Sequence, residues 1–276
     1  MPAMAAAPST VGMVRSKDGT NIAYSRIGQG PALIIVDGAM CYRAFGPSRP
    51  LAQALQDRFT VYVYDRRGRG ESGNTLPYAA NREVEDLAAL VQEAGGSAYI
   101  CGISSGAALA LEVANTVPGV TKLALFEAPF IVDRTREPMT IDYWRQIEQA
   151  ASREETRGDA IALFMKAVGV PGFMLVIMKL MPMWKGMKAV APTLPYDGAF
   201  VKHYQQGQPL PKDRWTGVKA SVLVLDGGKS PSWMRNAMKS LASILPGSQY
   251  RTLDGQTHMV KAPVMAPVLI DFFTEP

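Results

Sequence analysis

Cysteine and histidine are both scarce in this sequence, which contains two of each: Cys41, Cys101, His203 and His258. Two cysteines cannot build the disulfide framework of a small secreted domain, so we expect free thiols in a reducing compartment, with a redox pair as the alternative. No group of histidine, cysteine and acidic residues has the spacing of metal ligands. The sequence therefore predicts no metal site and implies no cofactor.

A long hydrophobic run is also absent. The most apolar stretch, residues 168–178, contains a proline and is followed by Lys179, which leaves it too short to span a bilayer. Residues 1–8 are rich in alanine and proline and carry neither the basic nor the apolar region of a secretory signal peptide. We therefore expect a cytoplasmic protein without stable membrane insertion.

Charge is spread along the sequence with one exception, although the formal net charge is +5. The one tight basic cluster is Arg66, Arg67 and Arg69, and we expect these arginines to tie loops to carboxylates rather than to bind substrate. Nucleic-acid-binding proteins usually carry a basic stripe or patch on one face. The charge pattern therefore predicts no nucleic-acid partner.

Apolar residues make up 47% of the 276 residues, which is enough to bury the core of one large domain or of a domain with an insertion. Short apolar, β-branched runs alternate with helical patterns. The predicted strands are residues 22–25, 32–36, 60–64, 98–101, 122–126, 221–225 and 250–253, and the predicted helices are residues 81–93, 105–115, 233–245 and 263–273. This alternation predicts an α/β fold with a mostly parallel sheet and helices on both faces.

The alternation stops between residues 131 and 215, where the pattern is helical and holds 7 of the 15 methionines. We interpret residues 131–215 as a helical cap inserted into a core made of residues 1–130 and 216–276. Methionine side chains adapt to irregular apolar shapes, so these residues either line a substrate pocket or form the cap's own core. The candidate pocket residues are Met174, Met178, Met181, Met183 and Trp184.

Polar motifs follow the predicted strands, at the edge where sheets of this type bind ligands. GISSG occupies residues 102–106, after one strand and at the start of a helix. DRRGRGESG occupies residues 65–73, Glu127 follows the predicted strand at 122–126, and DGQTHMV occupies residues 254–260. A serine, candidate acids and a histidine thus fall on one edge of the sheet, in the order serine, acid, histidine.

These motifs resemble those of the α/β-hydrolase superfamily, and the resemblance covers nearly the whole chain. GISSG is similar to the G-x-S-x-G nucleophile elbow of that family, DRRGRGESG is similar to its D-x-R-G-x-G-x-S loop, and His258 stands where its base stands. The resemblance implies an eight-stranded, mostly parallel sheet with helices on both faces and an inserted helical cap. It also implies that Ser104 is a nucleophile and that no cofactor takes part.

A serine nucleophile at this turn needs a base and a particular backbone conformation. A serine hydroxyl is a poor nucleophile at its free pKa and needs a base, and His258 is the candidate because His203 lies in the predicted cap. We expect Ser104 to adopt a positive φ, with glycines at positions 102 and 106 allowing the strand and helix to approach closely.

Two backbone N–H groups are expected to form an oxyanion hole. One belongs to Ser105, at the positive end of its helix. The resemblance implies that the other belongs to Ala39, with Met40 as the alternative donor and as a further contact for substrate.

The catalytic acid is open between two carboxylates. The family usually places an aspartate a few residues after the strand at 221–225, but that position is Ser230 here. Asp226 lies earlier, at the strand end itself. Glu127 occupies the other location used in the superfamily, in a layout similar to some haloalkane dehalogenases. We favour Glu127 on its position, with Asp226 as the alternative.

Asp37 and Ile103 depart from the family pattern, in which histidine commonly precedes the serine and histidine or glycine stands at the position of Asp37. A carboxylate beside an oxyanion hole opposes the developing negative charge, unless its side chain points toward the loop of Arg66 and Arg67. The sequence therefore supports two hypotheses.

The first hypothesis is an esterase-like serine hydrolase, monomeric or homodimeric, that cleaves a small hydrophobic ester, thioester or lactone through an acyl-serine intermediate. The alternative is a non-hydrolytic protein of the same fold, either a lyase or cyclase of secondary metabolism or a ligand-binding protein. The two differ in whether an acyl group forms on Ser104.

Overall fold

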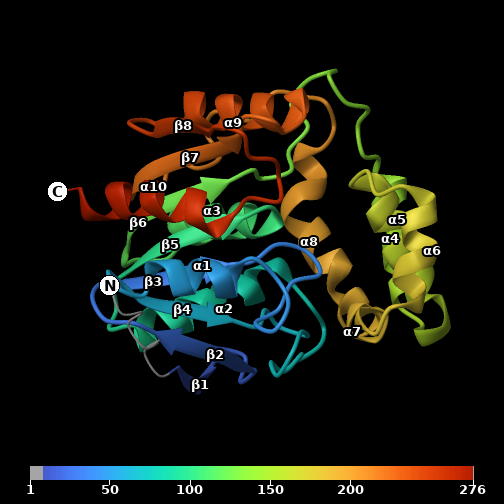
Figure 1. Ribbon diagram of the computed structural model, residues 1–276, viewed down its shortest axis with the longest axis horizontal. Coiled ribbons are helices and arrows are strands. Elements are labelled where there is room, and N and C mark those ends of the chain that lie inside the picture. Colours follow the sequence, from blue (N-terminus) through green and yellow to red (C-terminus); the bar gives the residue numbers. More distant parts are fainter. Residues whose placement is uncertain (1–8, 276) are drawn as a thin grey trace.

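The computed structural model describes residues 9–275, and the signal-peptide prediction for residues 1–8 lies outside them. Its centre is a sheet of eight strands in the order β1-β2-β4-β3-β5-β6-β7-β8 (Figure 1). The strands are β1 (Thr10–Arg15), β2 (Asn21–Ile27), β3 (Ala32–Val36), β4 (Thr60–Tyr64), β5 (Ala98–Ile103), β6 (Val120–Phe126), β7 (Ser221–Gly227) and β8 (Gln249–Leu253). Only β2 pairs in the antiparallel sense, with β1 and β4, so the predicted mostly parallel sheet is confirmed.

Helices cover both faces of this sheet, as predicted. The helices are α1 (Ser48–Leu55), α2 (Ala80–Glu93), α3 (Ser105–Thr116), α4 (Ile141–Ala151), α5 (Arg157–Ala167), α6 (Gly172–Leu180), α7 (Met183–Val190), α8 (Leu194–Val201), α9 (Ser232–Ile244) and α10 (Ala262–Thr274). Helices α2, α3 and α9 contribute to the core on one face, and α1 and α10 to the core on the other.

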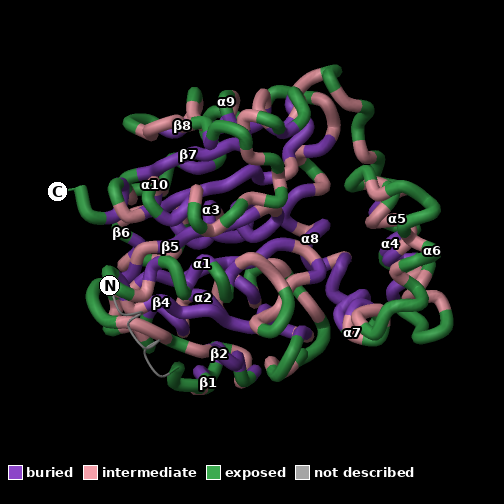
Figure 2. The backbone as a smooth tube through the Cα atoms, viewed as in Figure 1, coloured by how far each residue is buried: buried purple, intermediate pink, exposed green. Residues whose placement is uncertain are grey.

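The central strands are apolar throughout because both of their faces are buried. Successive side chains of β3 alternate between the two cores: Ile34 and Val36 belong to one, and Leu33 and Ile35 to the other. Figure 2 shows these strands as a continuous buried layer between the more exposed helices. A sheet buried in this way holds the residues at the carboxyl ends of its strands in fixed relative positions.

Two elements are absent from the sequence prediction, β1 and α1. Strand β1 forms the sheet edge and exposes Val11 and Met13, so its pattern does not show the two-sided burial of the central strands. Helix α1 has only eight residues and contains Pro50. Its Leu51 and Leu55 are buried in the core shared with α10, so packing stabilises a helix that is too short to be marked by propensity.

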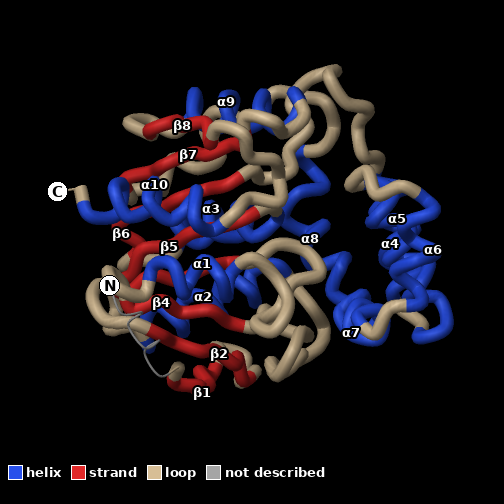
Figure 3. The backbone as a smooth tube through the Cα atoms, viewed as in Figure 1, coloured by secondary structure: helices blue, strands red, loops and turns tan. Residues whose placement is uncertain are grey.

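Five helices, α4 to α8, follow β6 and precede β7, and we call residues 141–204 the helical insertion. They lie together at one end of the molecule, beside the sheet (Figure 3). Helix α8 packs against both α3 and α4 and so joins the insertion to the core. In the described part of the chain, no helix combines the length and the apolar character needed to cross a bilayer.

Candidate active site

Ser104 lies at the sharp turn between β5 and α3. Its backbone has φ +58° and ψ −130°, the positive-φ geometry that the motif predicts. A Cβ at Gly102 would lie 2.6 Å from the Cα of Ala107, and a Cβ at Gly106 would lie 2.2 Å from the carbonyl oxygen of Val36. Both positions therefore require glycine, and the turn presents Ser104 at the carboxyl edge of the sheet.

A row of hydrogen bonds joins Ser104 to two distant residues. His258 Nε2 lies 3.2 Å from Ser104 Oγ, and His258 Nδ1 lies 2.7 Å from Glu127 Oε2. The other carboxylate oxygen, Glu127 Oε1, accepts a hydrogen bond of 2.8 Å from the backbone N–H of Gly227. Glu127 is fully buried and has φ +46°, so its backbone is strained at the end of β6.

This arrangement determines the tautomer that suits His258. A buried carboxylate is an acceptor only, so Nδ1 carries the proton that faces Glu127 and Nε2 is left to accept from Ser104. The imidazole also packs against the ring of Phe126, with centroids 6.2 Å apart and an interplanar angle of 17°. The Ser104 hydroxyl therefore faces a base that is held in position from two sides.

Asp226, the alternative acid, is also fully buried but is directed elsewhere. Its Oδ2 accepts a hydrogen bond of 2.5 Å from the hydroxyl of Tyr250, and no hydrogen bond joins it to His258 among the described residues. Ser230, at the position where the family usually has an aspartate, is buried, and its hydroxyl has no hydrogen-bond partner among residues 9–275. Of the two candidates, the structure brings only Glu127 to the imidazole.

Ala39 and Ser105, whose N–H groups are the predicted oxyanion donors, both line a cavity above Ser104. The Ser105 N–H belongs to the first turn of α3, where amides have no partner within the helix. The loop that contains Ala39 is held by Arg69, whose Nη1 donates to the carbonyl oxygens of Gly38 (2.8 Å) and Cys41 (3.2 Å).

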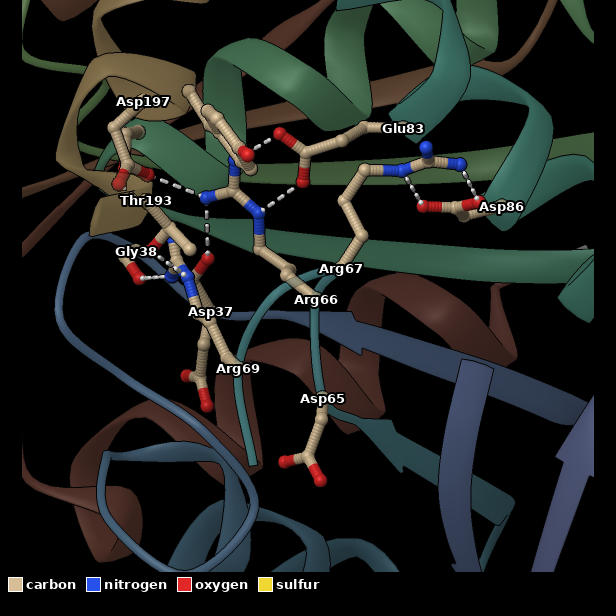
Figure 4. Close-up of polar contacts among 12 residues, drawn as sticks. Asp37, Gly38, Asp65, Arg66, Arg67, Arg69, Glu83, Asp86, Thr193 and Asp197 are labelled. Carbon is tan, nitrogen blue, oxygen red and sulfur yellow. Dashed lines mark hydrogen bonds and ion pairs between the residues drawn. The ribbon is translucent and has the colours of Figure 1, made fainter. Parts of the chain in front are cut away.

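The arginines of the DRRGRG loop are buried and paired with carboxylates, as expected (Figure 4). Arg66 forms a bidentate ion pair with Glu83, in which Nε and Nη2 lie 2.7 and 2.8 Å from the two carboxylate oxygens. Its Nη1 lies 2.5 Å from Asp197 Oδ1 on α8. Arg69 Nη2 lies 2.6 Å from the same aspartate. Asp197 also accepts a hydrogen bond of 2.8 Å from the hydroxyl of Ser105. The cluster therefore links the helical insertion to the elbow.

The charges of this cluster set the state of Asp197. Although burial raises the pKa of Asp197, the neighbouring Arg66 and Arg69 lower it below its usual value. Arg67 forms a separate bidentate ion pair with Asp86, in which Nε and Nη2 lie 2.8 and 2.6 Å from the two carboxylate oxygens (Figure 4). None of these three guanidiniums is left to bind substrate.

The Asp37 side chain takes neither of the directions considered from the sequence. It does not line the cavity above Ser104, and only its backbone carbonyl contacts Arg66, at 3.4 Å. The carboxylate lies beside Gly46 and Cys41, and Figure 4 shows it turned away from the Arg66 guanidinium. Both carboxylate oxygens are buried. Burial raises the pKa of Asp37 to about 6, while the neighbouring Ser48 and the charges of Arg69 and Arg66 act against that rise.

A cavity of about 520 Å³ lies above Ser104, between the sheet edge and the helical insertion. We call it the serine cavity. Its floor includes Ser104, Ser105, Ala39 and His258. Its apolar wall is formed by Met139, Trp144, Phe164, Val168, Val201, Trp233, Met234 and Met259. Two cationic residues, Arg136 and Lys229, also line it.

The substrate contacts predicted from the methionine-rich segment lie elsewhere, which corrects that prediction. Met174 and Met181 are 43% and 46% exposed, and Met178 packs partly against the insertion. Trp184 lines a separate surface depression beside Lys179. Met183 lines a third cavity with other residues of α7. Met40, the further substrate contact expected beside Ala39, lines that same cavity and not the serine cavity.

The reason is the orientation of α6, which has no buried residue and so turns its apolar side chains outward. The wall of the serine cavity comes instead from α4, α5, α8 and the start of α9. Trp233 and Met234 follow the carboxyl end of β7, and that position is the sequence signal that points to them.

The cysteines and possible metal ligands add no second site. Cys41 is half-buried and Cys101 is buried, and neither forms a disulfide within the described residues. Burial raises the pKa of both thiols to about 12, which keeps them protonated and unreactive. Between residues 9 and 275, no group of three or more histidine, cysteine or acidic side chains is arranged to hold a metal ion.

Comparison with known proteins agrees with this fold. A model of the Alpha/beta hydrolase family matches residues 36–268. An alpha/beta hydrolase from Sphaerobacter thermophilus DSM 20745 has 45% identity and a TM-score of 0.86 over 95% of this chain and 100% of that one. An enol-lactonase from Burkholderia xenovorans LB400 has 20% identity and a TM-score of 0.69 over 96% of this chain and 100% of that one, which shows a common fold.

Among curated proteins, the pimeloyl-[acyl-carrier protein] methyl ester esterase of Stenotrophomonas maltophilia (strain R551-3) is 36% identical over 102 residues. That match covers 37% of this chain and 37% of the esterase. The similarity is therefore confined to about a third of either protein.

Proposed function

This chain belongs to the alpha/beta hydrolase family, and within that family we propose that it is a serine hydrolase that cleaves a carboxylic ester, thioester or lactone through an acyl-serine intermediate. The observation that carries the proposal is the hydrogen-bonded row of Ser104, His258 and Glu127. The partial similarity to a methyl ester esterase supports the same reaction class. No step requires a cofactor.

In the first half of the proposed reaction, Ser104 Oγ attacks the carbonyl carbon of the substrate while His258 Nε2 takes the hydroxyl proton. The negative charge that develops on the carbonyl oxygen is stabilised by the N–H groups of Ala39 and Ser105. The bond to the leaving group then breaks, and the imidazolium returns its proton to the departing alkoxide or thiolate. The acyl group remains on Ser104.

In the second half, His258 removes a proton from water, and the hydroxide attacks the acyl-serine. Collapse of the second tetrahedral intermediate releases the acid and returns the proton to Ser104 Oγ. Glu127 touches neither the substrate nor the water. It holds the imidazole in the correct tautomer and stabilises its charged form in both halves.

The helical insertion acts as a cap in this proposal. Its Trp144, Phe164 and Val201 form the apolar side of the serine cavity. A volume of about 520 Å³ suits a small organic substrate, because ligand pockets typically hold about 300–1,000 Å³.

The test is covalent labelling by a fluorophosphonate, read by intact mass, together with hydrolysis of nitrophenyl esters of several chain lengths. We expect one adduct and ester turnover in the wild type, and loss of both in Ser104→Ala. The matched control is Ser232→Ala, an exposed serine at the start of α9, which is expected to keep both. A folded wild type that forms no adduct and hydrolyses no ester would contradict the proposal and favour the non-hydrolytic alternative.

A further inference from the structure

Arg136 is a part of the serine cavity that the proposed mechanism does not use. It lies in the loop between β6 and α4, is half-buried and lines the cavity with Ser104. Its Nη2 donates a hydrogen bond to the carbonyl oxygen of Ala167, at the end of α5. Its guanidinium lies over the ring of Trp233, 4.3 Å from the centroid. These two contacts hold the guanidinium at the cavity wall.

No carboxylate compensates this cation. Arg136 forms no ion pair with any residue between 9 and 275, whereas Arg66, Arg67 and Arg69 each face at least one carboxylate. Burial lowers the pKa of Arg136, and the titratable group that acts against this is Tyr143 rather than an acid. A partly desolvated, unpaired cation costs free energy, which an anionic ligand would recover.

The other charged groups around the cavity do not supply that anion. Asp197 lines the cavity but is already paired with Arg66 and Arg69. Lys229 also lines the cavity, but it is exposed, so water solvates its charge. Within the described residues, the serine cavity therefore combines an apolar wall with one half-buried cation, Arg136, that pairs with no carboxylate.

We propose that Arg136 binds a carboxylate of the substrate, so that the hydrolysed compound is a half-ester of a dicarboxylic acid. The inference rests on the proposed function, because it names the substrate class of the same site. The planar guanidinium matches a carboxylate in geometry, and its donors beyond the Nη2 bond to Ala167 make no hydrogen bond within residues 9–275. The apolar wall contacts the chain between the free carboxylate and the ester.

The experiment compares kcat/KM for monoethyl esters of dicarboxylic acids of four to eight carbons with that for ethyl esters of the matched monocarboxylic acids. The wild type is expected to prefer the anionic series. In Arg136→Met, the ratio of anionic to neutral kcat/KM is expected to fall about 10- to 100-fold, as loss of charge-assisted hydrogen bonds implies. Arg136→Lys keeps the charge but loses the planar pair of N–H donors, and it is expected to recover part of that ratio.

Arg134→Met is the matched control, because Arg134 is an exposed arginine two residues away that does not line the cavity. It is expected to keep the wild-type ratio. An equal ratio in the wild type, Arg136→Met and Arg134→Met would overturn the inference. If Arg136→Met does not fold, a wild-type ratio in Arg136→Lys together with no preference for any anionic ester would overturn it as well.

Calorimetric titration of Ser104→Ala with monoethyl adipate and with ethyl hexanoate separates this inference from the proposed function. Binding of the half-ester that Arg136→Met abolishes supports the inference, even if the wild type hydrolyses no ester. Turnover of neutral esters by the wild type, without Arg136-dependent binding of the half-ester, contradicts the inference and leaves the serine hydrolase proposal standing.

Discussion

At the scale of single residues, four buried carboxylates near the carboxyl edge of the sheet differ in what faces them. Glu127 faces an imidazole, Asp197 two guanidiniums and Asp226 a phenol hydroxyl, whereas Asp37 lies beside Ser48. The same chemical group therefore has four different environments. Because water is excluded, the partner of each buried carboxylate has a large effect on the free energy of its charged form.

The first residue-scale prediction separates Glu127 from Asp226. In Glu127→Gln the imidazole loses its anionic partner, so kcat/KM for an ester substrate is expected to fall about 100- to 10,000-fold, with KM changed far less. Asp226→Asn is expected to lose less than about tenfold, because Asp226 contacts Tyr250 rather than His258. Steady-state kinetics of both variants checks this. A larger loss in Asp226→Asn would assign the acid to Asp226 instead.

At the scale of elements, α8 is the helix through which the insertion meets the core. It packs against α3, whose first residues form the elbow, and its Asp197 reaches both buried arginines and the Ser105 hydroxyl. A change at this helix is therefore expected to affect stability and catalysis together. The contact places the cap and one predicted oxyanion donor in a single hydrogen-bonded cluster.

Asp197→Asn tests that coupling. Neutralising Asp197 leaves the buried Arg69 without a carboxylate partner in residues 9–275 and leaves Arg66 with Glu83 alone, so the free energy of unfolding is expected to fall by about 3–5 kcal/mol in urea denaturation. In the folded fraction, kcat/KM for esters is expected to fall as well, because the group that accepts from Ser105 loses its negative charge and its pairing with the arginines.

The control for this element is Asp142→Asn on α4, where an exposed pair with Arg145 is expected to contribute at most about 0.5 kcal/mol. Equal losses of unfolding free energy in Asp142→Asn and Asp197→Asn would show that the buried cluster does not anchor the insertion.

At the scale of the whole molecule, the stability of the fold depends on the two cores that lie on either side of the sheet, and exposed helices contribute little to it. Helix α6 exposes Phe173, Val176 and Leu180, and no residue of α6 is buried. The cores on the two faces of the sheet instead contain most of the fully buried apolar residues. We therefore expect the free energy of unfolding to depend on the ionisation of groups buried near the carboxyl edge of the sheet, such as Asp37.

The pH dependence of unfolding is the prediction at this scale. Because the pKa of Asp37 is raised to about 6 in the folded state, its contribution to stability is fully present below about pH 4 and is lost as pH rises through 6. Between pH 4 and 7.5, the wild type is therefore expected to lose up to about 3 kcal/mol of unfolding free energy relative to Asp37→Asn.

Urea denaturation at four pH values across that range measures this difference. The exposed Asp57, substituted as Asp57→Asn, is the control and is expected to differ from the wild type by a constant amount. A difference between Asp37→Asn and the wild type that does not vary with pH would contradict the prediction.

Local sequence was enough for the fold class and for the elbow. Alternating apolar strands and amphipathic helices are patterns of neighbouring residues, and seven of the eight strands follow from them. The elbow follows too, because the close approaches at positions 102 and 106 involve backbone only a few residues away or on the adjacent strand. Edge strand β1 and short helix α1 did not follow, because packing rather than local pattern stabilises them.

Only the packed chain decided which carboxylate reaches the histidine and which residues surround the serine. Glu127 and His258 are 131 residues apart, Ser104 and His258 are 154 apart, and no local pattern reports on such distances. The same holds for the cavity, because a methionine-rich helix is equally apolar whether it faces the serine or the solvent. Its direction is set by how the insertion packs through α8 onto the core, and that packing left α6 outside the cavity. Arg136 and Trp233 line the same cavity from the loop after β6 and from α9, two segments about 100 residues apart in sequence.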